Sequence, residues 1–127
     1  MKEAQIHLIN KMFNDKTIRT VWNKDEEKYY ISVIDIITAL MENDYQESRN
    51  YWKVLKHRLK KEGNQTVTNC NQLKLKAQDG KYRSTDVVDI EGMFRIIESI
   101  PSPNAEPMKL WLARLGKERI DEAFDPS

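Results

Sequence analysis

Residues 33–41 are the segment that most constrains the fold of this chain. Their sequence, VIDIITALM, has one charged residue, Asp35, and is apolar on nearly every side when wound as a helix. A helix that is apolar all round must be buried, so we expect it at the centre of the core. Ser32 stands three residues before Asp35, which is the spacing of a capping box and predicts the start of this helix. Asn43 and Asp44 are expected to break it.

Two extended segments precede this helix. Residues 17–22 alternate polar and apolar side chains and are rich in β-branched residues, which predicts a half-buried strand. The polar run at residues 23–27 predicts a hairpin loop, and residues 28–31 resume as the partner strand. Residues 6–13 are interpreted as a further strand in preference to a short helix.

A second helix is expected over residues 47–62, and Gly63 suits the position just after its end. Its inward face is a stripe of large apolar side chains at helical spacing: Tyr51, Trp52, Leu55 and Leu59. Residues 66–70 and 73–76 are predicted to be extended. The Asp-Gly pair at residues 79–80 indicates a tight turn, after which residues 81–84 return as a strand.

The end of the chain predicts two further helices. Asp89 can cap a helix that continues to Ile100, and the Pro101-Ser102-Pro103 segment stops it. Pro107 suits the first turn of a last helix, which reaches about residue 123. The fold class is therefore α+β, in one domain over residues 1–127. The order is an N-terminal β-hairpin or small sheet, two helices, a second β-hairpin and two C-terminal helices.

The charges of the chain are unevenly distributed, although its formal net charge is only +1. Residues 49–83 carry ten basic and two acidic groups, a net charge of +8, whereas the segments before and after it are net acidic. Such a concentration of positive charge is typical of a surface that binds nucleic acid.

Most of this positive charge falls on the second helix. Four cations at spacings i, i+4, i+7 and i+11 are expected along one face, opposite the apolar stripe, and His57 and Lys61 widen that face. No acidic residue occurs between residues 49 and 61, so the repulsion between like charges is not relieved within the helix. Neutralisation of phosphates is favoured over a merely solvated face. With the neighbouring Asn50, the candidates on this helix are Arg49, Asn50, Lys53, Lys56, His57, Lys60 and Lys61.

The second hairpin adds four basic residues to this candidate site. Lys74 and Lys76 alternate with leucines on one strand, and Lys81 and Arg83 alternate likewise on the other. A basic helix followed by a basic hairpin is typical of proteins that place the helix in the major groove and the hairpin along the backbone. Polar side chains that suit base edges lie nearby: Gln46, Arg49, Asn50, Asn64 and Gln65.

Catalysis finds little support in the sequence, and we expect no enzymatic activity, cofactor or metal. The glycines form no phosphate loop, and His7 and His57 have no ligand partner at metal spacing. Cys70 is expected to be a small core residue; its alternative is a nucleophile paired with His57. Asp86, Asp89 and Glu91 are interpreted as helix-start residues, and a metal-dependent nuclease is the weakest alternative.

The location expected for the chain is the cytoplasm. One cysteine excludes a disulfide framework within the chain, and no apolar run approaches the length of a membrane span. The first ten residues lack the apolar core of a signal peptide.

Three stretches of the chain resemble a known family. They are IRTVW at residues 18–22 with YYISVIDI at 29–36, RNYWKVLKHRL at 49–59, and GMFRII at 92–97 with PSPNAEPMKLWL at 101–112. Together they resemble the Bro-N domain, found in baculovirus repeated-ORF proteins and in phage antirepressors. Within that group the chain is most similar to the bacterial DNA-damage-inducible protein D type. Relatives of that type usually carry a further C-terminal region, so an isolated domain and the N-terminal part of a longer protein both stay open.

The resemblance implies a non-catalytic DNA-binding domain of a phage-antirepressor-like or DNA-damage-responsive transcription regulator, with duplex DNA as its partner. The alternative is a protein-interaction module that captures a repressor or recombination protein. In that case the acidic ends of the chain, or the aromatic residues of the first hairpin, would make the contact. Trp22, Tyr29 and Tyr30 could also stack on single-stranded bases, but we expect them to pack in the core.

Overall fold

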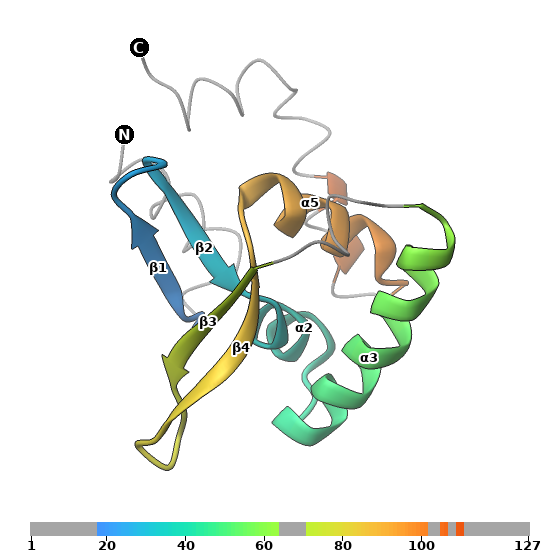
Figure 1. Cartoon of the computed structure of the whole chain (residues 1–127). Helices are drawn as coiled ribbons and strands as arrows, with labels where there is room; N and C mark the ends of the chain where they lie inside the picture. Colours follow the sequence, from blue (N-terminus) through green and yellow to red (C-terminus); the bar gives the residue numbers. More distant parts are fainter. Residues whose placement is uncertain (1–17, 64–70, 102–104, 107–108, 111–127) are drawn as a thin grey trace.

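The computed structural model describes residues 18–63, 71–101, 105–106 and 109–110. The elements follow the order β1 (Thr20–Asn23), β2 (Lys28–Ser32), α2 (Val33–Met41), α3 (Tyr45–Lys61), β3 (Asn71–Lys76), β4 (Tyr82–Val88) and α5 (Ile90–Ser99). Helices and antiparallel strands occupy separate layers, which confirms the α+β class (Figure 1). Both predicted hairpins and the two helices between them are present.

The two hairpins belong to one four-stranded antiparallel sheet with the order β1-β2-β4-β3. They are joined where Ile31 of β2 pairs with Val88 of β4, and Ser32 pairs with Val87. The predicted strand at residues 81–84 was therefore too short at its C-terminal end, because β4 continues to Val88. The polar Asp86 lies within this strand, just before its apolar end, and its carboxylate accepts hydrogen bonds from Trp52 and Lys56 of α3 and from Gln72 of β3.

The main core lies between the sheet and the helices. Helix α2 is at its centre, as expected from its sequence: Val33, Ile36, Ile37 and Leu40 are fully buried. The inward stripe of α3 is confirmed, since Trp52, Leu55 and Leu59 belong to the same cluster as the buried residues of α5. Tyr29 is also part of this cluster, and Tyr30 is buried in a smaller cluster on the other face of the sheet.

Side-chain caps begin all three of these helices. Ser32 caps α2 by accepting a hydrogen bond from the Asp35 amide at 3.3 Å, and Asp89 caps α5 as predicted, accepting from the Gly92 amide at 3.0 Å. Asp44 does the same for α3, accepting from the Glu47 amide at 2.8 Å. Helix α3 therefore starts at Tyr45, two residues earlier than predicted. The Asn-Asp pair was correctly expected to end α2, but its aspartate also starts the next helix.

A buried carboxylate and its arginine partner connect α2, α3 and β3 with the residue before β1. Arg19 forms a two-pronged contact with Asp35: its Nε lies 2.8 Å from Oδ2 and its Nη2 lies 3.0 Å from Oδ1. The Arg19 amide donates to the same carboxylate, and Tyr45 at the start of α3 donates its hydroxyl to Oδ1 at 3.0 Å. Arg19 also donates from Nη1 to the carbonyl of Lys76 at the end of β3. The Asp35 side chain is only 1% exposed, so its charge depends on these donors.

Several predicted segments lie outside the described residues. These are the strands at 6–13 and 66–70, together with Cys70 and nearly all of the last helix from Pro107 to residue 123. Of the two C-terminal helices expected, the described part gives bounds for α5 alone. None of the helices in the described part has the length and apolar character needed to span a bilayer.

Removing the arginine of the buried pair should destabilise the fold strongly. Arg19→Met leaves the Asp35 carboxylate buried without its cation, and we expect the free energy of unfolding to fall by about 3–5 kcal/mol. The measurement is urea unfolding followed by circular dichroism. The double variant Arg19→Met with Asp35→Leu should recover part of that loss, because no charge is then left unpaired. An Arg19→Met protein as stable as the wild type would contradict the importance of this pair.

Candidate nucleic-acid interface

Helix α3 carries exposed cations on the side that faces solvent. Arg49, Lys53, Lys60 and Lys61 are exposed, whereas Ser48, Trp52, Leu55 and Leu59 are buried. Lys53, Lys60 and Lys61 form no ion pair with any residue that the structure describes. Lys60 and Lys61 also lie in the last turn, where positive charge is favoured by the helix dipole.

Lys56 is placed differently from the other predicted cations of α3. It is half-buried, and its Nζ lies 3.0 Å from Oδ2 of Asp86 on β4. The same carboxylate accepts hydrogen bonds from Trp52 Nε1 at 2.8 Å and from Gln72 Nε2 at 2.9 Å. Lys56 therefore does not lie opposite the apolar stripe, as the spacing had suggested. It borders the stripe on the side of the sheet and attaches α3 to the second hairpin.

The environment of Asp86 favours its charged form. Burial by itself would raise the pKa of this carboxyl, but hydrogen bonds from Trp52, Gln72 and Lys56 outweigh that effect and lower the pKa below its ordinary value of 3.8. Sequence inspection interpreted Asp86 as a helix-start residue, and that was wrong. Only its place in β4 brings it opposite Gln72 and next to α3.

The strand register divides the four basic residues of the hairpin between the two faces of the sheet. Lys74 and Lys76 pair with Ser84 and Tyr82, and they share the face of Gln72 and Asp86, which is the face toward α3. Arg83 is opposite the buried Leu75 and lies on the other face. Lys81 has the parity of Arg83, since it lies two residues before it in the chain. The hairpin therefore presents two lysines to the α3 side, not four cations.

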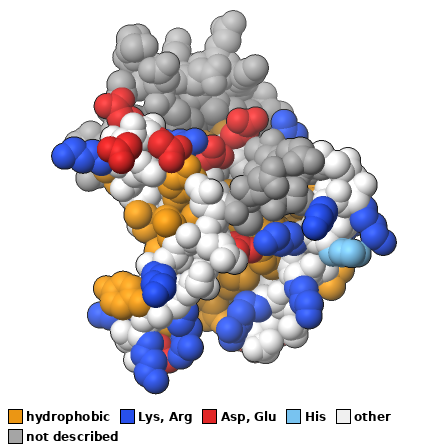
Figure 2. Space-filling view, viewed as in Figure 1, with side chains coloured by type: hydrophobic (Ala, Val, Ile, Leu, Met, Phe, Trp, Pro, Cys, Tyr) orange, Lys and Arg blue, Asp and Glu red, His pale blue; other side chains and the backbone are white. Residues whose placement is uncertain are grey.

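Arg83 also forms an ion pair with a residue of the hairpin turn. Its Nη2 contacts the Asp79 carboxylate, and the pKa of Asp79 is lowered by a hydrogen bond from the Lys81 amide and by this contact with Arg83. Of the predicted hairpin residues, Lys74 and Lys76 are thus the two that share a face with α3. Figure 2 shows Lys and Arg side chains over the hairpin and over α3 on one face of the molecule.

Six exposed cations form the cationic face of the domain: Arg49, Lys53, Lys60 and Lys61 of α3, and Lys74 and Lys76 of β3. Lys56, bound to Asp86, lies between the helix and the hairpin. Negative side chains gather elsewhere in the same view, around the β1–β2 turn and the start of α5 (Figure 2).

Two exposed apolar side chains of this region were not singled out from the sequence. Val54 on α3 is 71% exposed, and Tyr82 on β4 is 67% exposed. Tyr82 pairs with Lys76 in the register and so lies beside a cation of the cationic face. The only sign of them in the sequence was an apolar residue among charged ones, and this is weak because single exposed apolar residues are common.

The polar residues at the start of α3 interact with one another. Arg49 Nη2 donates to Gln46 Oε1 at 3.3 Å, and Gln46 Nε2 donates to Asn50 Oδ1 at 3.2 Å. All three side chains are exposed. Of the other candidates for base contacts, Asn64 and Gln65 lie outside the described residues, while His57 is exposed on α3 between Lys53 and Lys61.

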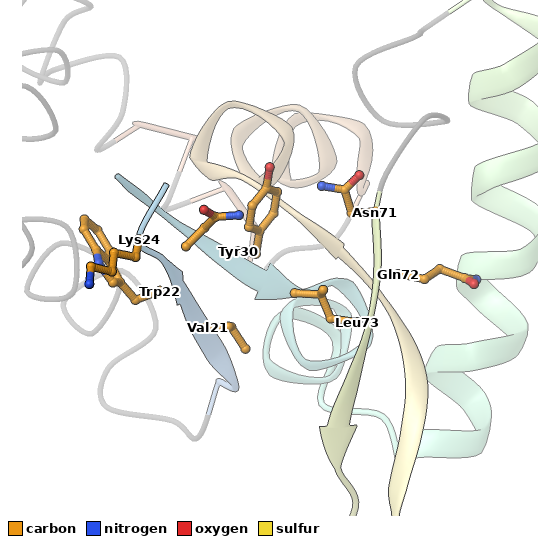
Figure 3. Close-up of a pocket in the computed structure, with 8 residues that line it drawn as sticks. Val21, Trp22, Lys24, Tyr30, Asn71, Gln72 and Leu73 are labelled. Carbon is orange, nitrogen blue, oxygen red and sulfur yellow. The ribbon is translucent and has the colours of Figure 1, made fainter. Parts of the chain in front are cut away.

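A separate pocket of about 400 Å³ opens on the side of the sheet away from α3. Figure 3 shows Val21 on one side of it and Leu73 and Asn71 on the other, with Tyr30 between them. Tyr30 donates its hydroxyl to Glu26 Oε2 at 2.8 Å; burial and this carboxylate raise the pKa of the phenol. The expectation that Tyr29 and Tyr30 pack in the core is confirmed, because each is only 7% exposed.

The acidic residues near α5 serve structural contacts in the described part of the chain. Asp89 caps the helix and also forms an ion pair with Lys28, whose Nζ lies 3.1 Å from Oδ2. Among the described residues there is no group of three or more His, Cys, Asp or Glu side chains that could hold a metal ion.

The comparisons with known proteins give one match. The family model described as the BRO family, N-terminal domain, matches residues 17–119. That range includes every residue of the cationic face and all the elements named above. The comparisons with curated proteins and with solved structures gave no match.

The junction at Asp86 should make stability depend on pH in a defined direction. Because the pKa of Asp86 is lower in the folded protein than in the unfolded chain, its contribution is present above pH 3.8 and is lost as the pH falls through the folded pKa. We therefore expect Asp86→Asn to be less stable than the wild type at pH 7, with a difference that shrinks steadily in acid. Urea unfolding of both proteins at several pH values measures this, and a constant difference would contradict it.

Proposed function

Because the chain belongs to the BRO family through its N-terminal domain, we propose that it binds duplex DNA with the cationic face. Domains of this family are generally linked to DNA binding in antirepressor-like proteins. The single observation that carries the proposal is the arrangement of positive charge. Helix α3 presents exposed cations without ion pairs to described residues, and the register of β3 turns Lys74 and Lys76 toward the same side.

In this proposal α3 enters the major groove and the hairpin follows the sugar–phosphate backbone. An α-helix fits the width of the major groove, and lysines at its margins reach the phosphates on either side. The lysines of β3 project on alternate positions from one face of the strand, so both can contact a single backbone. Counterions released from the phosphates provide the favourable free energy.

Asp86 would set the geometry of this interface without contacting DNA. Its carboxylate holds Lys56, Trp52 and Gln72 together, which fixes the position of the hairpin relative to α3. It also neutralises the cation nearest the junction, so that Lys56 is the cation of α3 least available to a phosphate. We propose that Lys56 contributes to binding mainly through this positioning.

The cellular role that we propose is that of a non-catalytic regulator in the cytoplasm, of the phage-antirepressor-like or DNA-damage-responsive kind. The resemblance to the DNA-damage-inducible protein D type favours the second. In either role the domain would recruit the regulator to DNA, and a transcriptional effect would follow from where it binds.

A second candidate function is capture of a protein such as a repressor or recombination protein. The pocket on the opposite side of the sheet favours it, because Val21 and Leu73 offer apolar surface beside the amide of Asn71. Tyr29 and Tyr30 are each only 7% exposed, so they would contribute little surface to such a contact. A partner recovered after nuclease treatment, and lost in Leu73→Asp, would support this function.

Neutralising two cations of α3 should weaken DNA binding and its dependence on salt. We expect Lys53→Gln with Lys60→Gln to lower the slope of log affinity against log salt concentration by about 2, because each phosphate contact contributes about 0.9. Both side chains are exposed, so the fold should be unaffected. Fluorescence anisotropy with a labelled duplex at several salt concentrations measures the slope.

The matched control is Lys24→Gln with Arg95→Gln. These two exposed cations lie on the β1–β2 loop and on α5, so the double variant has the same net charge but an intact cationic face. We expect it to keep the wild-type slope. Equal losses in both double variants would show that only net charge matters, and would sink the assignment to the cationic face.

A further inference from the structure

We propose that α3 recognises A·T base pairs through Asn50 and Val54. This inference rests on the proposed function and adds to it which base pairs the domain prefers. It concerns the side of α3 that points most directly away from the core, rather than the cations beside it.

The buried residues of α3 define this outward side. Ser48, Trp52, Leu55 and Leu59 turn toward the core. On a helix of 100° per residue, Asn50 and His57 lie almost diametrically opposite them, and Lys61 and Val54 lie to one side of that direction. All four of these side chains are exposed. A helix lying in the major groove presents this side to the floor of the groove, where the base edges are.

Asn50 has the chemistry and the orientation to recognise adenine. An asparagine amide can accept a hydrogen bond from adenine N6 and donate one to N7. Asn50 Oδ1 already accepts from Gln46 Nε2 at 3.2 Å, and Gln46 is in turn held by Arg49. These two hydrogen bonds fix the orientation of the Asn50 amide, and Oδ1 keeps a second lone pair for another donor. The amide nitrogen makes no hydrogen bond with the residues that the structure describes.

Val54 provides the apolar half of the same recognition. Its side chain is 71% exposed on a helix whose other outward residues are polar or charged. The 5-methyl group of thymine is the apolar feature of the major groove, and an aliphatic side chain contacts it favourably. Residues 50 and 54 are one helical turn apart on the same side, about 6 Å along the axis, which spans about two base-pair steps.

The cations beside these residues would hold the helix in register. Lys53 lies on one border of the outward side, and Lys61 lies on the outward side itself, nearer the C-terminal end; neither is paired with an acidic residue in the described part of the chain. Phosphate contacts of this kind fix position and orientation but carry no sequence information. Selectivity would therefore reside in Asn50 and Val54, and affinity largely in the lysines.

The experiment is selection of binding sites from a duplex library with a randomised centre. The full chain is used as wild type, Asn50→Ala and Val54→Ala. Leu110→Ala, which truncates another exposed aliphatic residue at 59% exposure, is the matched control. We expect wild type and control to enrich A·T pairs at two positions that are about two base-pair steps apart. Each α3 variant should lose about tenfold of the preference at one position, while affinity for random duplex at low salt stays within about twofold.

The outcomes separate this inference from the proposed function. A wild type that binds duplex DNA without base preference, or that enriches G·C pairs, would overturn the A·T inference alone. Enrichment that persists unchanged in both α3 variants would overturn the roles of Asn50 and Val54. A wild type that fails to bind duplex DNA even at low salt would overturn the proposed function itself, and a protein partner lost in Val54→Ala would assign the exposed valine to that contact instead.

Discussion

The ion pair between Arg19 and Asp35 is the interaction on which the arrangement of this domain depends. The buried Asp35 carboxylate accepts hydrogen bonds from the amide and the guanidinium of Arg19, just before β1, and from the hydroxyl of Tyr45 at the start of α3. The Arg19 guanidinium also donates to the carbonyl of Lys76 at the end of β3. A buried carboxylate is unfavourable unless its oxygens are fully satisfied, so these elements can meet in few other ways. The central helix α2 buries apolar side chains on nearly every side, which does not by itself fix how its neighbours are arranged. The ion pair does, because its geometry places specific elements next to one another.

A second carboxylate, Asp86, connects that scaffold to the cationic face. It is bonded to α3 through Trp52 and Lys56 and to β3 through Gln72, so the helix and the hairpin are held at one junction. The net charge of +1 thus conceals an organised distribution. Acidic groups inside the fold act as positioning partners, and several of the cations outside it have no acidic partner in the described residues. Mutual repulsion of like charges is the cost of such a surface, and contact with an anionic polymer relieves it.

Much of the fold could be predicted from the sequence, because its signals are local. The apolar run of α2, the stripe of α3, the cap at Asp89 and the Asp-Gly turn each depend on neighbouring residues. The joining of two hairpins into one sheet could not, since it rests on pairing between residues far apart in the chain, with a polar Asp86 inside the strand. The candidate site divides in the same way. Helical spacing identified the cations of α3, but only the register shows that Arg83 lies on the other face from Lys74 and Lys76, and that Lys56 is held by Asp86.

The measurement that tests this account most directly is a titration of the isotope-labelled domain with a short duplex, followed by amide chemical shifts. DNA bound on the cationic face should shift the amides of α3 and of β3 around Lys74 and Lys76, and leave those of the β1–β2 turn and of α5 near their free positions. Raising the salt concentration should reverse the shifts. Shifts centred on the pocket around Val21 and Tyr30, or none at low salt, would contradict binding of duplex DNA by the cationic face.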